Sequence, residues 1–177
     1  MKLKLLVALL LSMAFTLAHA GITDDLKSKA ASKSKEAATD KANKEVAAKV
    51  NKKLLAESRK NQCSFKSGTD ELDKGCGKKS KKLANQIIDV KKQLQAQGHS
   101  GFKFIVSGHT DSSGDAAKNK ELSLRRAQVM VKELVSQGVD AKDIEAVGMG
   151  SEQMLVKPDN TPAKKAKNRR YEVQIRF

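Results

Sequence analysis

The stretch VSGHTDSSGDAAKNKELSLRRA, residues 106–127, decides how the rest of the chain is organised. It begins as an apolar strand, breaks at Gly108 and places an acid at Asp111. A glycine-containing loop follows, and a helix then carries Arg126. A carboxylate can hold an ammonium group, and a planar guanidinium can hold a carboxylate through two parallel hydrogen bonds. The stretch therefore predicts a strand-loop-helix unit whose two charged ends can bind a zwitterion.

Segments on both sides of this stretch complete an α+β pattern. Apolar residues recur at helical spacing over residues 77–97 and again over residues 122–134, which predicts two amphipathic helices. Four further segments predict strands: residues 63–67, 102–106, 143–150 and 171–177. The order β-α-β-α-β-β predicts a two-layer α+β sandwich, with both helices on one face of a small mixed sheet. A helical N-terminal segment is expected to precede it.

The N-terminal part of the chain is expected to lie outside this domain. Residues 1–20 contain two lysines, an apolar run of about fourteen residues and a final Ala-His-Ala, the pattern of a cleaved export signal. The run is shorter than the ~20 residues that a bilayer span needs. Residues 21–60 are rich in Ala and Lys and contain no Pro, which predicts a helix. Residues 61–177 are predicted to form the globular domain.

Two interpretations of residues 21–60 stay open. The apolar residues Val46, Val50 and Leu54 form only a narrow stripe on the predicted helix. The segment can therefore be a solvated spacer. It can also pack on an envelope protein, self-associate or lie on an anionic membrane surface.

The net charge of +15 attracts polyanions. Export makes acidic glycans, anionic lipid or lipopolysaccharide better partners than nucleic acid. With no Trp and one Tyr, the chain also lacks the aromatic platforms of single-strand nucleic-acid binders. A surplus of lysine can equally well serve only to keep the chain soluble.

Cys63 and Cys76 are the two cysteines of the chain. An even count in an exported protein predicts a disulfide between them. Two buried free thiols are the alternative. A metal site is a poor interpretation because no histidine lies near the pair.

The spacing of Asp111 and Arg126 does not by itself establish a ligand site, because an internal salt bridge between them has the same sequence pattern. Further residues add to the pattern in order: Gly108-His109-Thr110-Asp111, Gly114, Asn119, Leu122-Ser123, Arg126-Ala127, Gly148, Gly150 and Asn168-Arg169-Arg170. In this order they resemble the OmpA-like C-terminal domain, a peptidoglycan-binding module of outer-membrane proteins, peptidoglycan-associated lipoproteins and flagellar stator proteins. The resemblance covers residues 61–177.

The resemblance implies a site for the meso-diaminopimelate of the peptidoglycan stem peptide. Asp111 is expected to take its ammonium group, and Arg126 the carboxylate at its free end. Three further residues are expected to shape the pocket: Thr110, Asn119 and Leu122. The resemblance leaves Arg170 either at the edge of the pocket or paired with an acid of the sheet. It also implies a periplasmic, wall-associated protein, with the outer membrane as a further location.

The chain departs from the family just after Phe65. Many members carry an aromatic or acidic residue there, whereas this chain has Lys66 and Ser67. The wall of the pocket opposite Asp111 and Arg126 is therefore not predicted by the resemblance.

A hydrolase is the least favoured function. His109, Asp111 and either Ser112 or Ser123 supply the residue types of a nucleophilic triad. The chain has no Gly-x-Ser-x-Gly elbow, and His99 and His109 lack the spacing of a metal pair. We therefore expect no enzymatic activity, cofactor or metal. The remaining alternative is an envelope interaction protein that acts through its basic N-terminal helix, with the domain as an anchor.

Overall fold

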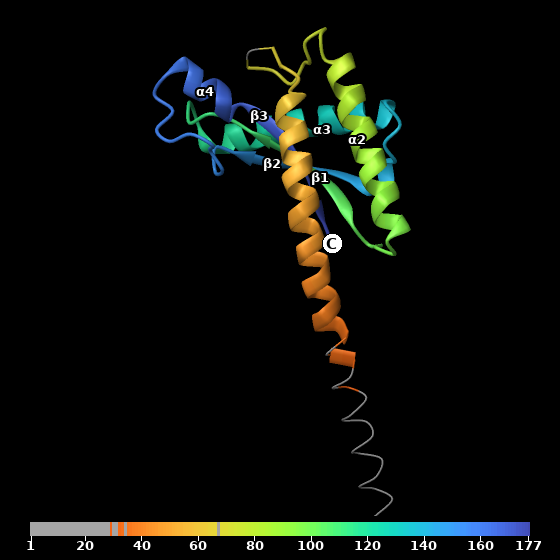
Figure 1. The fold of residues 1–177 in the computed structure, drawn as a ribbon. Coiled ribbons are helices and arrows are strands. Elements are labelled where there is room, and N and C mark those ends of the chain that lie inside the picture. Colours follow the sequence, from red (N-terminus) through yellow and green to blue (C-terminus); the bar gives the residue numbers. More distant parts are fainter. Residues whose placement is uncertain (1–28, 30–31, 34, 67) are drawn as a thin grey trace, which may run out of the picture. The chain divides into compact units, whose positions relative to one another are not determined.

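The computed structural model describes residues 29, 32–33, 35–66 and 68–177 (Figure 1). The export signal predicted for residues 1–20 lies outside this part of the chain. The chain divides into two units between Lys44 and Glu45. Residues 35–60 are helical, as predicted, and residues 45–60 belong to the second unit. Within the described residues, no helix combines the length and the apolar character needed to cross a membrane.

A three-stranded mixed sheet forms the centre of the second unit (Figure 1). Its order is β2-β1-β3, with β1 at Lys103–His109, β2 at Ile144–Gly150 and β3 at Arg170–Arg176. β1 runs parallel to β2 and antiparallel to β3. The pairing of β1 with β2 shifts register between Gly108 and His109, at the end of the strand that leads to Asp111.

Two long helices, α2 (Gly77–Ala96) and α3 (Ala116–Ser136), pack on the sheet and confirm the predicted α+β class. The helical spacing seen in the sequence places the apolar side chains of α2 inward, including Leu83, Ile87 and Leu94. They join the apolar side chains of β1 and β3 in one core. Leu54, from the helix of residues 45–60, is fully buried in that core. Residues 45–60 therefore contribute to the stability of the domain.

The edge of β3 differs from the sequence prediction. The predicted strand at 63–67 forms only an isolated bridge between Phe65 and Leu72 in its described part. Two side-chain amides bond to the β3 backbone instead. Asn51 accepts from the N–H of Ile175 at 2.6 Å and donates to its carbonyl at 3.2 Å. Gln62 bonds in the same way to the N–H and carbonyl of Tyr171. These amides satisfy backbone groups that a fourth strand would otherwise satisfy.

A short helix, α4 (Pro162–Asn168), lies between the strands predicted at 143–150 and 171–177, where no helix or strand was predicted. Thr161 caps it by accepting a hydrogen bond from the N–H of Lys164, and Pro162 occupies its first turn. Both residues are favoured at these positions of a helix, so the Thr161-Pro162 pair could have predicted the start of α4. α4 ends next to Arg169 and Arg170, which line the site described below.

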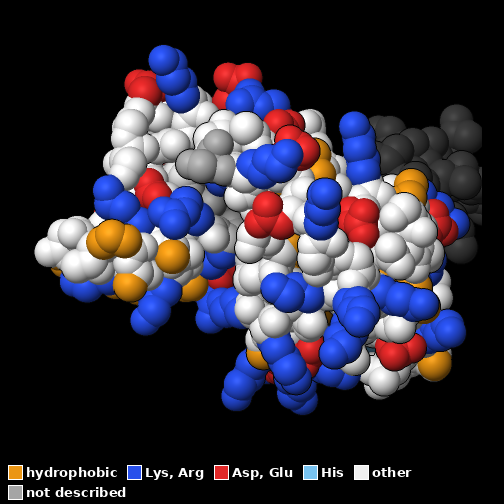
Figure 2. All heavy atoms as spheres, turned by 90° about the horizontal axis from the view of Figure 1, so that it is seen from above, with side chains coloured by type: hydrophobic (Ala, Val, Ile, Leu, Met, Phe, Trp, Pro, Cys, Tyr) orange, Lys and Arg blue, Asp and Glu red, His pale blue; other side chains and the backbone are white. Residues whose placement is uncertain are grey.

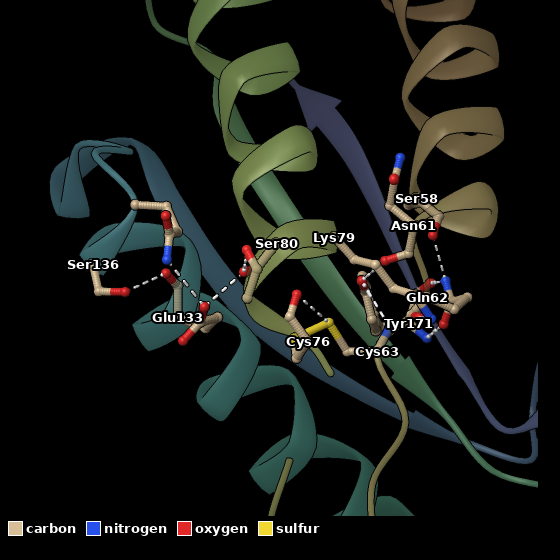
Figure 3. Close-up of a disulfide and its surroundings, with 12 residues drawn as sticks. Ser58, Asn61, Gln62, Cys63, Cys76, Lys79, Ser80, Glu133, Ser136 and Tyr171 are labelled. Atoms are coloured by element: carbon tan, nitrogen blue, oxygen red, sulfur yellow. Dashed lines mark hydrogen bonds between the residues drawn. A yellow bond between two sulfur atoms is a disulfide. The ribbon is translucent and has the colours of Figure 1, made fainter. Parts of the chain in front are cut away.

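The predicted disulfide is confirmed. The sulfur atoms of Cys63 and Cys76 are bonded, and the Cα atoms are 5.0 Å apart. Figure 3 shows the bridge between the start of α2 and the segment after the N-terminal helix, with Tyr171 beside it. The hydroxyl of Tyr171 donates to the carbonyl of Asn61. The bridge thus holds the entry to α2 against the segment that borders β3.

Loss of this bridge is expected to lower the free energy of unfolding by about 3 kcal/mol, because the reduced unfolded chain regains the entropy of a short closed loop. Denaturant unfolding of the Cys63→Ser/Cys76→Ser double variant measures the loss. The parent protein treated with a reductant is the matched comparison. Mass spectrometry of exported material showing two free thiols would contradict the assignment.

Candidate functional site

Asp111 lies two residues after the end of β1, at the wall of a cavity of about 890 Å³. Its Oδ1 accepts from the N–H of Ser113 at 2.9 Å, and its Oδ2 accepts from Nη1 of Arg169 at 2.8 Å. Burial raises the pKa of the carboxyl group, but the hydrogen bonds from Arg169 and Ser113 outweigh it and the net pKa is lowered. Asp111 is therefore a carboxylate at neutral pH.

Arg126 reaches the same cavity from α3 and is mostly buried. Its Nε donates to the carbonyl of Thr69 at 2.8 Å, and its guanidinium lies 5.1 Å from the ring centroid of Phe65. These contacts orient the guanidinium without neutralising its charge. Among the described residues, no ion pair joins Arg126 to Asp111, so the internal salt bridge that their spacing allowed is absent. Asp111 pairs with Arg169 instead.

The other residues predicted for the pocket also line this cavity, and they are Thr110, Asn119, Leu122 and Arg170. Asn119 lies in the first turn of α3 and donates to the carbonyl of Ser113 at 2.8 Å, which ties the loop to the helix. Thr110 is buried, and its Oγ1 has no hydrogen-bond partner within the described part of the chain. The structure thus brings together all six residues of the predicted site.

Arg170 combines both roles that the sequence left open. It lines the cavity, and its Nε donates to Oε1 of Glu172 at 2.9 Å. Its two terminal nitrogens donate to the carbonyls of Asn168 and Gln153. Burial raises the pKa of Glu172, but hydrogen bonds from Arg170 and Arg59 outweigh this effect and lower it. Glu172 is therefore the acid of the sheet that pairs with Arg170.

His109 is buried beside this acid. Its Nε2 is 3.2 Å from Oγ of Ser107 and 3.9 Å from Oε2 of Glu172. Burial lowers the pKa of the imidazole to about 4, helped by the charges of Arg170 and Arg59 and opposed by Glu172. His109 is therefore neutral at physiological pH. Its Nδ1 has no partner within the described residues.

The buried histidine predicts a loss of stability in mild acid. Between the ordinary histidine pKa of 6.5 and the folded value of about 4, the unfolded chain binds the proton and the folded chain does not. The free energy of unfolding is expected to fall as pH drops through this window, by up to about 3 kcal/mol. Denaturant unfolding from pH 7 to pH 4 measures it, with His109→Asn as the comparison. An unchanged slope between pH 7 and pH 5 in this variant would contradict the assignment, since the pKa values of Glu172 and Asp111 are lowered from ordinary values that already lie below pH 5.

Sequence reasoning missed two cavity-lining arginines as site residues. Arg169 is part of the Asn-Arg-Arg motif at residues 168–170, so that motif could have indicated Arg169 as a site residue. Arg59 lies in the N-terminal helix and donates to Glu172 from Nε and Nη2, at 3.1 and 2.7 Å. No motif pointed to Arg59, because only the fold brings the helix next to β3.

The structure describes most of the cavity wall opposite Asp111 and Arg126, which the sequence did not predict. Phe65 and Gly68 line the cavity, together with Gln62 and Cys63. The side chain of Lys66 donates to Glu71 at 2.6 Å. Ser67 lies outside the described residues. The wall therefore consists of the disulfide-bonded segment and an aromatic ring, not of an acid after Phe65.

Residues 64–169 match the model of the OmpA family. The chain belongs to the OmpA family. This family of peptidoglycan-binding domains is non-enzymatic, which confirms the expectation that the chain is not an enzyme. Accordingly, Ser112 bonds to Asp159 rather than to His109, and Asp111 is paired with Arg169.

Curated relatives match shorter parts of this OmpA-family chain. The outer membrane porin F of Pseudomonas fluorescens is 46% identical over 70 residues, which cover 40% of this chain and 21% of the porin. The probable lipoprotein YiaD of Escherichia coli is 39% identical over 70 residues, covering 40% of this chain and 32% of YiaD. The matches thus span about a fifth to a third of these relatives.

Solved structures confirm the OmpA-like fold. The peptidoglycan-associated lipoprotein from Burkholderia pseudomallei superposes with a TM-score of 0.53 at 21% identity, covering 65% of this chain and 89% of that one. The periplasmic domain of Helicobacter pylori MotB gives the same TM-score at 19% identity, covering 64% of this chain and 69% of that one.

Proposed function

We propose that this OmpA-family domain binds peptidoglycan through the free end of meso-diaminopimelate in the stem peptide. Asp111 takes the ammonium group and Arg126 takes the carboxylate. The observation that carries the proposal is the placement of both charges in one cavity without a mutual ion pair. Opposite charges that are held apart can each meet a complementary group of one zwitterion.

The surroundings of the two charges suit this role. The contacts of Arg126 with Thr69 and Phe65 hold the guanidinium in place before the ligand arrives, which lowers the entropy cost of binding. The Asp111 carboxylate is already ionised and accepts from Arg169, whose side chain is half exposed. The incoming ammonium group either shares the Asp111 carboxylate with Arg169 or displaces Arg169 from it.

Peptides that differ only at the free end of the third residue test the proposal. A stem tripeptide containing meso-diaminopimelate presents both charged groups, whereas the lysine-containing peptide lacks the carboxylate for Arg126. Loss of one charge-assisted pair is expected to weaken binding about 10- to 100-fold. Isothermal titration calorimetry of both peptides at physiological salt measures the difference.

A salt series is the control for this measurement. Figure 2 shows Lys and Arg side chains spread over one face of the molecule, with acidic side chains between them. A surface of this kind can hold an anionic polymer without any pocket. Equal affinity for the two peptides, or binding that disappears at moderate salt, would contradict the proposed site.

The N-terminal segment fits the role of a connecting element. Its stripe of Val46, Val50 and Leu54 packs against the core of the domain, so these side chains are not offered to a partner. We infer that the protein is exported to the periplasm and associated with the wall there, in keeping with relatives named as outer membrane proteins. An envelope protein or an anionic lipid bound by residues 21–44 is the alternative route of attachment.

A further inference from the structure

The cavity carries more positive charge than a zwitterionic end group requires. Among the described residues, five cationic side chains line it and only one carboxylate does, that of Asp111. The cations are Arg59, Arg126, Lys167, Arg169 and Arg170. The free end of diaminopimelate brings one ammonium and one carboxylate, so it leaves this imbalance unchanged. A ligand with further negative charge is a better electrostatic match.

Part of the imbalance lies at Glu172. Nε and Nη2 of Arg59 and Nε of Arg170 all donate to the same oxygen, Oε1. One carboxylate therefore faces two guanidinium groups, and the cluster retains a net positive charge beside the cavity. Each nitrogen of the Arg170 guanidinium makes one hydrogen bond, because its two terminal nitrogens donate to backbone carbonyls.

Arg59 differs from Arg170 in accessibility. Its side chain is 47% exposed, whereas that of Arg170 is 5% exposed. No described residue accepts a hydrogen bond from Nη1 of Arg59, so this nitrogen can donate to a ligand while Nε and Nη2 stay on Glu172. Glu172 thus holds the guanidinium in a defined position at the cavity wall.

His109 is a second polar group of the cavity, next to Glu172. It lines the cavity and is buried to more than nine-tenths, yet its Nδ1 has no partner within the described residues. A buried polar atom without a partner costs free energy, and a ligand atom can supply the missing bond. The Ser107 hydroxyl donates its one proton to the carbonyl of Glu172, and Nε2 faces Oε2 of that residue, so the neutral imidazole carries its proton on Nε2 and leaves Nδ1 as an acceptor.

We propose that Nη1 of Arg59 forms a second anion subsite, which binds a carboxylate of the ligand other than the one held by Arg126. The subsite rests on the proposed function and extends it. Its ligand is a stem peptide with a further free carboxylate, in place of one that is amidated at that position. The N-terminal helix supplies Arg59 and so contributes directly to ligand selection.

Three versions of one peptide test the subsite. They are L-Ala-γ-D-Glu-meso-diaminopimelate, the same peptide with the glutamyl α-carboxylate amidated, and the same peptide amidated at the main-chain carboxyl group of diaminopimelate. All three keep the free end for Asp111 and Arg126. We expect amidation at one of these two positions, and not at the other, to weaken binding to the parent protein about 10-fold in calorimetric titrations.

The Arg59→Gln variant is expected to bind all three peptides with equal affinity. That affinity should match the affinity of the parent protein for the amidated peptide that the parent binds weakly. Arg59→Lys should retain part of the preference because it keeps the charge. Lys60→Gln is the matched control, since Lys60 is exposed and does not line the cavity. This variant should discriminate as the parent does.

The outcomes separate the subsite from the proposed function. Equal binding of all three peptides by the parent overturns the subsite and leaves the function standing. A parent that binds none of them overturns both. A preference that persists in Arg59→Gln, or a loss of all binding in this variant, shows that Arg59 does not act as a carboxylate subsite.

Discussion

Asp111→Ala and Arg126→Ala are each expected to abolish co-sedimentation of the protein with purified peptidoglycan sacculi. Each substitution removes one half of the proposed zwitterion clasp and leaves the matching ligand charge unpaired in the cavity. Truncation of one partner of such a charge pair costs about 2–5 kcal/mol, or about 30-fold to more than 1,000-fold in affinity. Binding assays across a range of sacculus concentrations measure the loss.

The fold is expected to survive both substitutions. Among the described residues, Asp111 bonds only to its own loop and to the half-exposed Arg169, and Arg126 bonds to backbone carbonyls of the segment around Thr69. Arg125→Ala is the matched control, because Arg125 is the adjacent arginine but pairs with Glu121 and Asp70 at the surface. If both variants sediment like the parent and like Arg125→Ala, the assigned pocket is wrong.

Gly108→Ala is expected to prevent folding or to lower the free energy of unfolding by at least about 3 kcal/mol. An added Cβ at Gly108 would lie 2.1 Å from the backbone carbonyl oxygen of Ser123. Backbone atoms on α3 cannot yield as the end of a side chain can, so α3 would have to move away from β1. Denaturant unfolding followed by circular dichroism measures the change.

Gly77→Ala is the control for this substitution. A Cβ at Gly77 meets no atom within 4 Å, and alanine suits the helix that begins there. Its free energy of unfolding should match or slightly exceed that of the parent. An unfolding midpoint of Gly108→Ala equal to that of the parent would show that the close contact of α3 with β1 is wrong. Because β1 leads to Asp111 and α3 carries Arg126, a Gly108→Ala protein that does fold should bind the wall poorly.

Several elements of the protein were readable from the sequence because they depend on local periodicity or on local chemistry. Leu83, Ile87 and Leu94 recur at helical spacing and mark the buried face of α2. The alternation before Phe177 marks β3, and the pair of cysteines marks the disulfide. The ordered motif around Asp111 indicates the family and assigns six residues to one site.

The remaining contacts depend on residues that the chain brings together from far apart, and no period marks them. Asp111 has Arg169 as its partner because α4 and β3 place that guanidinium at the end of β1. Asn51 and Gln62 occupy the edge of β3 where a strand was predicted, since a side-chain amide offers the same donor and acceptor as a backbone peptide group.

Thus the sequence alone determined the OmpA-like architecture and singled out Asp111 and Arg126, the two residues proposed to form the clasp. Only the tertiary structure decided which charges neighbour that clasp, and it placed Arg59 of the N-terminal helix among them. The physical reason is that pairing of charges depends on distance in space. That distance is set by the packing of whole elements, not by the spacing of residues along the chain.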